Sequence, residues 1–243
     1  MIYKTISLAE SQVGKYVDIN GDGIPEGVIF ADLAVGGKGY YGIKDGLCKF
    51  EIPTIKEDLK DYIVIGEYDD QINGKQKVLA PILDGNDRFY IMGFNDYSGA
   101  WYKNAIENQI NSRLTKQKFG AGRQNTINIL NQWKNDGYGP KDDNDLWNYI
   151  QDDVKNGWFI PSKAEWVAFA RNLKVCNWTV YSNYPESGTE YYTKRGLSNW
   201  YWTSSRHTST IENKNMTFGM RWSYGMDACD INVSEHVRLA LTI

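Results

Sequence analysis

The apolar pattern changes its period twice along this chain, and this order constrains the fold more than any other feature. Stretches with strand character run to about Phe94, stretches with helical spacing fill the middle from about Ala100, and strand character returns after Gly188. Neither an internal repeat nor a Pro/Ser-rich linker separates these parts. We therefore predict one α+β domain over residues 1–243, with 1–15 as a lead-in and both ends of the chain in a single sheet.

The expected elements can be placed on the sequence. Strands are predicted in two parts of 16–34 and at 62–65, 78–83, 88–94, 200–205, 215–220 and 236–243. Helices are predicted over 101–114, 125–133 and 146–154. Ser162 and Glu165 have the S-x-x-E spacing of a capping box, which predicts a further helix that ends near Leu173.

Charge and cysteine content exclude several classes of protein. The chain has 27 Lys+Arg and 30 Asp+Glu, a net charge of -3, which argues against general nucleic-acid binding. Cys48, Cys176 and Cys229 form no C-x-x-C pair, so we expect reduced thiols and no zinc site. Nothing resembles a signal peptide or the roughly 18 apolar residues of a membrane span, so we expect a product that is cytoplasmic as synthesised and not inserted in a membrane.

One motif resembles a calcium loop. Asp18, Asn20 and Asp22 have the D-x-N-x-D-G spacing, but position twelve is Ile29, where an EF-hand needs a bidentate Glu. This favours a hairpin rich in Asx and Gly residues. We expect no cofactor or metal, with calcium at Asp18, Asn20 and Asp22 as the alternative.

Catalytic motifs are scarce. Gly37, Gly39 and Gly42 satisfy G-x-G-x-x-G, but the following residues do not open a helix, so we reject a dinucleotide site. The sequence has no Walker A, H-E-x-x-H or G-x-S-x-G motif, and its two histidines are His207 and His236. We therefore assign no catalytic residue and do not expect an enzyme.

Two polar and aromatic runs, 206–210 and 221–232, lie between strongly patterned strands and read as loops. Binding surfaces favour such mixtures, because aromatic residues and Arg supply anchors while Ser and Asn supply adaptable hydrogen bonds. Ordinary surface loops share this composition.

The sequence resembles the variable proteins of diversity-generating retroelements. The segments that carry the resemblance are, in order, GWFIPSKAEW at 157–166, LS at 197–198, YWTSS at 201–205, FG at 218–219 and VRL at 237–239. YVD at 16–18, RFYIM at 88–92 and GAGRQNT at 120–126 are similar to gut-bacterial and phage members. The resemblance implies a C-type lectin fold, shared with formylglycine-generating enzyme and a phage major tropism determinant, in which helices pack on a mixed, mostly antiparallel sheet.

In such proteins a retroelement rewrites the 3' end of the gene with errors at template adenines. The resemblance implies a binding protein, without catalysis, whose region from about 196 to 243 is diversified to recognise a protein or glycan at a cell surface or phage receptor. It also implies a phage or prophage product that can associate with a virion. The implied ligand-binding residues are Arg206, His207, Thr208, Ser209, Arg221, Ser223, Tyr224, Asp227, Asp230 and Asn232.

Codon chemistry is consistent with these positions. An AAC or AAT codon altered at its adenines can encode every one of these ten residues, but not Trp222, Met226 or Glu235, which we expect to belong to the scaffold. We expect Trp158, Trp166, Trp202 and Phe218 to hold that scaffold.

Two other functions stay open. An oxidase similar to formylglycine-generating enzyme would need Cys176 and Cys229 as its reactive pair. A lectin-fold virion or adhesin subunit would have an undiversified, fixed ligand.

Overall fold

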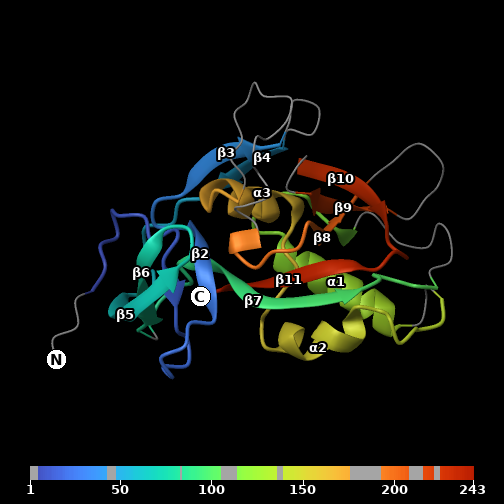
Figure 1. Ribbon diagram of the computed structural model, residues 1–243, viewed down its shortest axis with the longest axis horizontal. Helices are drawn as coiled ribbons and strands as arrows, with labels where there is room; N and C mark the ends of the chain where they lie inside the picture. Colours follow the sequence, from blue (N-terminus) through green and yellow to red (C-terminus); the bar gives the residue numbers. More distant parts are fainter. Residues whose placement is uncertain are drawn as a thin grey trace.

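A computed structural model of the protein describes residues 5–42, 48–82, 84–104, 114–135, 139–175, 193–207, 216–221 and 225–243. Strands from both parts of the chain that were predicted to be β join one nine-stranded sheet (Figure 1). Their order across the sheet is β10 (Gly225–Asp230), β9 (Met216–Arg221), β8 (Trp200–Arg206), β11 (Glu235–Thr242), β7 (Phe89–Gly99), β2 (Gly27–Asp32), β1 (Tyr16–Val17), β6 (Gly74–Pro81) and β5 (Tyr62–Asp70). Neighbouring strands are antiparallel except for the pairs β1–β6 and β11–β8. The predicted α+β class and single sheet are confirmed, with β7 between the N-terminal strands and β11.

Helices cover both faces of this sheet. In Figure 1, α3 (Lys163–Asn172) lies above β7 and β11, α2 (Trp147–Lys155) lies below them, and α1 (Gly122–Lys134) lies behind them. A separate hairpin of β3 (Gly37–Tyr41) and β4 (Cys48–Ile52), which the sequence did not reveal, packs against α3. Apolar side chains fill the layer on each face, so the sheet has no open apolar side in this region.

The capping box predicted for the third helix is present. Ser162 Oγ accepts a hydrogen bond from the backbone N–H of Glu165, and the Glu165 carboxylate accepts one from the backbone N–H of Ser162. The same carboxylate accepts a bond from the N–H of Gly120 at 3.0 Å. The cap therefore also attaches the segment before α1 to the start of α3.

The helix predicted over 101–114 is wrong for residues 101–104. Residues 101–104 form a turn, and 105–113 lie outside the described residues. The backbone N–H groups of Trp101 and Tyr102 both donate to the carbonyl of Ile231, at 2.9 and 3.2 Å. The side chains of Trp101 and Tyr102 fill the core beside α1 and α2. Their apolar character therefore reflects burial in this core, although in the sequence it resembles the apolar spacing of a helix.

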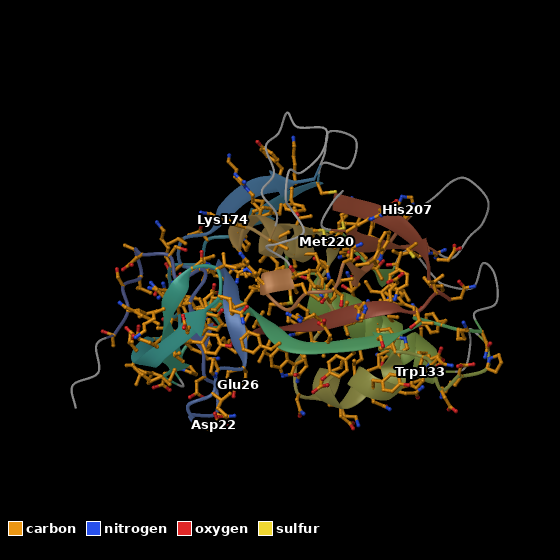
Figure 2. All side chains as sticks on the ribbon, in the orientation of Figure 1. Asp22, Glu26, Trp133, Lys174, His207 and Met220 are labelled. Carbon is orange, nitrogen blue, oxygen red and sulfur yellow. The ribbon has the colours of Figure 1, made fainter. Side chains whose placement is uncertain are left out.

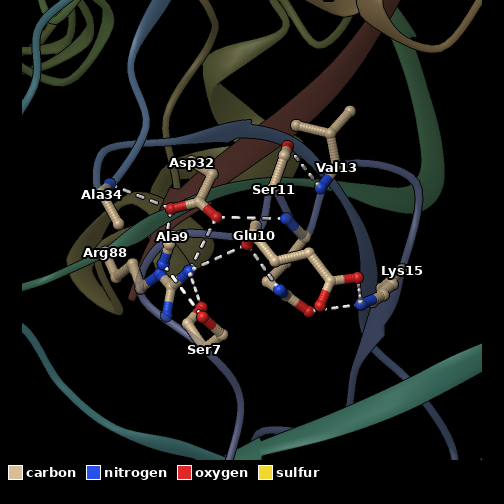
Figure 3. Close-up of polar contacts among 10 residues, drawn as sticks. Ser7, Ala9, Glu10, Ser11, Val13, Lys15, Asp32, Ala34 and Arg88 are labelled. Carbon is tan, nitrogen blue, oxygen red and sulfur yellow. Dashed lines mark hydrogen bonds and ion pairs between the residues drawn. The ribbon is translucent and has the colours of Figure 1, made fainter.

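A buried ion pair ties the N-terminal segment to the sheet (Figure 3). Arg88 and Asp32 are both fully buried and form two parallel bonds of 2.9 Å, from Nε to Oδ1 and from Nη2 to Oδ2. Arg88 Nη2 also donates to the carbonyl of Ser7, and the Asp32 carboxylate accepts from the N–H groups of Gln12 and Ala34. Residues 7–12 are thereby attached to β2 and to the start of β7.

We predict that Arg88→Ala lowers the free energy of unfolding by about 3–5 kcal/mol, because it leaves the Asp32 carboxylate buried without its cation. Urea unfolding measures the loss. Lys155→Ala is the matched control, since it breaks the solvent-exposed pair with Asp152, and it should unfold like the wild type. A loss of less than about 1 kcal/mol in Arg88→Ala would contradict the prediction.

Candidate functional site

The predicted binding residues that the structure describes lie at one end of the sheet. Arg206 ends β8 and His207 follows it, Arg221 ends β9, Asp227 and Asp230 belong to β10, and Asn232 lies in the turn to β11. Thr208, Ser209, Ser223 and Tyr224 lie outside the described residues. Three adjacent strands thus carry the candidate surface.

The loop predicted over 221–232 is wrong for its central part, because Gly225–Asp230 is the edge strand β10. It pairs antiparallel with β9, which places Met226 opposite Met220 and Ala228 opposite Phe218. Met226 is buried, as expected of a scaffold residue. The polar residues Asp227 and Asp230 hide the strand pattern in the sequence, and the pairing with β9 supplies the hydrogen bonds that keep the segment extended.

The strands beneath this surface are held by two tryptophans. Trp166 Nε1 donates to the carbonyl of Trp202 at 3.0 Å, and Trp202 Nε1 donates to the carbonyl of Gly99 at 3.3 Å. Both side chains are fully buried, which confirms them as scaffold residues. Trp158 and Phe218 are only partly buried.

The candidate residues form two groups. Arg206 lies opposite Thr217, whereas Arg221 lies opposite Trp200. Since Arg221 is four positions after Thr217 on β9, these two places are about 13 Å apart along the strand, at about 3.3 Å per residue. The structure brings Arg206 and His207 together and keeps Arg221 at the other end of the ladder, with its guanidinium 5.7 Å from the centre of the Trp200 ring.

A cationic groove begins beside His207. The His207 ring lies 4.7 Å from the Phe218 ring, and Lys163 Nζ lies 4.0 Å from the centre of that ring. Lys163 in turn lines a groove of about 1100 Å³. Among the described residues that line it, the charged ones are Lys38, Lys49, Lys118, Lys163 and Glu51. The groove could not be predicted from the sequence, because its lysines come from the β3–β4 hairpin and from two segments far from it along the chain.

Local electrostatics decide the protonation of two groups here. Burial, and then the charge of Lys163, lowers the pKa of His207, so its imidazole is neutral at neutral pH. Burial, and then the charges of Glu235 and Asp230, raises the pKa of Cys229 to about 11. Its thiol is therefore protonated at neutral pH, and the thiolate is the nucleophilic form. Cys176 lies outside the described residues.

The calcium-like motif forms the predicted hairpin between β1 and β2. Asp18 is buried, and its two carboxylate oxygens accept from the N–H groups of Gly21 and Gly23 at 2.6 and 2.8 Å. Carboxylate oxygens of Asp18, Asp22 and Glu26 lie within 4.8 Å of one another, and oxygens of this kind suit calcium. Glu26, which is not among the three predicted calcium ligands, joins Asp18 and Asp22 in this cluster. Figure 2 shows Asp22 and Glu26 at the lower left, away from His207 at the upper right.

Comparison with known proteins adds little to this description. No family model matches the chain, and no curated protein matches it. Among solved structures it is similar to a fimbrial protein from Bacteroides ovatus ATCC 8483, with a TM-score of 0.41 and 16% identity. The similarity covers 64% of this chain and 36% of that protein, so the matched part is about a third of the other protein's length. In the part of this chain that the structure describes, no helix is long and apolar enough to cross a membrane.

We predict that Asp18→Ala lowers the free energy of unfolding by about 1–3 kcal/mol in EDTA, because two backbone N–H groups lose their acceptor. Urea unfolding measures this loss. Asp22→Ala is the control, since the exposed Asp22 carboxylate accepts from the N–H of Ile24 in the same turn. Asp18→Ala with wild-type stability would contradict the prediction.

The same variants test the calcium alternative. If calcium binds, it raises the melting temperature of the wild type, and Asp22→Ala loses this rise. An unchanged melting temperature in millimolar calcium would leave the hairpin with a structural role alone.

Proposed function

We propose that this protein binds a macromolecular ligand, a protein or a glycan, through its C-terminal surface at about 196–243, without catalysis. In this proposal the sheet and helices are a C-type lectin fold, and a retroelement diversifies the surface. The sequence resemblance motivates the proposal. The observation that supports it best is that the same three strands carry both buried scaffold residues and accessible candidate residues.

This separation is clear along β8, β9 and the turn after β10. Trp202, Thr217 and Met220 are fully buried, whereas Arg221 and Asn232 are exposed. The candidate residues Arg206, His207, Asp227 and Asp230 are partly exposed. Substitution of exposed side chains changes stability little when the packed layer beneath them is untouched. Such a surface can vary while the backbone stays in place.

The state of Cys229 supports binding over oxidase chemistry. An oxidase of the formylglycine-generating type needs a pair of reactive cysteines in this region, and the one present, Cys229, is a partly buried thiol whose pKa is raised to about 11 by this burial. No other cysteine lies in the region from 196 to 243.

The charge beside the candidate surface indicates which kind of ligand this surface favours. The groove that starts at Lys163 carries four lysines and one glutamate among its described lining residues. Complementary charge steers association and selects partners. We therefore favour a ligand whose contact face is acidic.

We predict that Arg221→Ala changes the free energy of unfolding by no more than about 0.5 kcal/mol, because the side chain is exposed. Met226→Ala, on the adjacent strand, should lose about 2–5 kcal/mol because it leaves a cavity in the core. Urea unfolding of the two variants makes the comparison. Equal losses would remove the distinction between surface and scaffold on which the proposal depends.

DNA sequencing beside the gene tests the retroelement itself. We expect a near-copy of the 3' end that differs from it only where the copy has adenine, next to a gene for a reverse transcriptase. That copy would identify the variable residues directly. Its absence would overturn diversification and leave a binding protein with one fixed ligand.

A further inference from the structure

A second cavity, of about 290 Å³, lies outside the candidate surface, between β1, β2, β5 and β7 and residues 194–196. Three aromatic rings line one part of it, those of Tyr16, Tyr68 and Phe94. Arg195 and the polar residues Asp69 and Gln71 also line it. Small-molecule pockets begin at about 300 Å³, so this cavity suits a ligand of about one ring.

An ion pair with Asp70 fixes the position of the Arg195 side chain at this cavity. This side chain is only 7% exposed, and Nη1 donates to Asp70 Oδ2 at 3.1 Å. The same Oδ2 accepts a bond from the Tyr16 hydroxyl at 2.5 Å, and Oδ1 accepts from the N–H groups of Ile72 and Asn73 at 2.8 Å each. Both oxygens of Asp70 are therefore in use, and Asp70 acts as a positioning residue for the guanidinium.

The other edge of the guanidinium has no hydrogen-bond acceptor among the residues that the structure describes. Its two nitrogens there, Arg195 Nε and Nη2, are both buried. Buried donors without an acceptor are rare because they lose their hydration without compensation. Nε and Nη2 form the edge of arginine that matches the two oxygens of a carboxylate. Since neither nitrogen is open to solvent, a ligand reaches them only when side chains at the cavity wall shift.

The rings of Tyr16, Tyr68 and Phe94 supply an aromatic wall to the cavity. Tyr68 and Phe94 are 40% and 38% exposed, and their rings are nearly parallel, at 11°, with centroids 6.3 Å apart. The Tyr16 ring lies 4.3 Å from that of Tyr68. The C–H face of a sugar ring can stack on such a surface, while the exposed polar groups of Asp69 and Gln71 can bond its hydroxyls.

We propose that this cavity binds a pyranose that carries a carboxylate, as in a uronic acid. The carboxylate pairs with Nε and Nη2 of Arg195, and the ring stacks on Tyr68 and Phe94. Asp69 and Gln71 line the cavity together with the aromatic rings, and their polar groups can bond the hydroxyl groups of a sugar. Because an aromatic acid lacks these hydroxyl groups, we favour a sugar. This site is independent of the candidate surface on β8, β9 and β10.

Calorimetric titration with glucuronate, glucose and benzoate tests the proposal. We expect saturable binding of glucuronate, no binding of glucose at the same concentration, and weaker binding of benzoate. Arg195→Lys keeps the positive charge beside Asp70 but removes the two-donor edge, so it should weaken glucuronate binding about tenfold or more. Methyl glucuronide distinguishes two sources of the ligand. If the cavity binds this glycoside, the ligand is the terminal residue of a glycan, and if the cavity excludes it, the ligand is the free acid.

Tyr68→Ala provides a second variant, because Tyr68 is well exposed and its loss should not unfold the protein. It should also weaken binding, whereas the control Tyr149→Ala, which removes an exposed tyrosine on α2, should bind as the wild type does. Absence of glucuronate binding, equal binding of glucose, preference for benzoate, or wild-type affinity in Arg195→Lys and Tyr68→Ala would each overturn the proposal. Arg221→Ala should leave glucuronate binding unchanged, which separates this test from that of the proposed function.

Discussion

The pairing of β11 with β7 is the contact on which the rest of the sheet depends. Through it the three strands β8, β9 and β10 join the N-terminal strands. One carboxylate reinforces the junction, because Asp96 on β7 accepts bonds of 2.6 Å from Arg238 Nε on β11 and from the Tyr201 hydroxyl on β8. Val237 and Leu239 point into the core beside α1 and α2, while Ala240 packs into the core beside α3. The last strand in sequence therefore connects both cores and sets the position of the candidate surface.

The two recognition sites that we propose depend on different physical properties. At the β10 end, charged and polar side chains stand on a buried scaffold beside a groove lined by lysines, and in the proposed function these side chains change without refolding. At the cavity between β1, β5 and β7, Arg195 is held by Asp70, and Asp70 is held by Tyr16 and two backbone N–H groups. In this proposed site Asp70 fixes the guanidinium, while binding at Nε and Nη2 requires side chains at the cavity wall to shift.

Local signals in the sequence were the reliable ones. The capping box at Ser162 and Glu165 predicted the start of α3, and helical spacing predicted α1 and α2, because hydrogen bonds and side chains within a few residues decide these features. Two predictions were wrong because contacts between distant segments decide the structure at these places. Residues 101–104 looked helical because Trp101 and Tyr102 fill the core, and 225–230 looked like a loop because its strand character depends on pairing with β9.

The sequence by itself determined the α+β class, the helix cap and the hairpin at Asp18, since each follows from the apolar pattern or from contacts close along the chain. Only the tertiary structure decided which candidate residues meet. Arg206 and Arg221 are close in sequence but lie at opposite ends of the ladder, whereas Asp70 and Arg195 are 125 residues apart and form a buried ion pair. Strand register and the packing of distant segments determine such juxtapositions, and no local pattern in the chain encodes them.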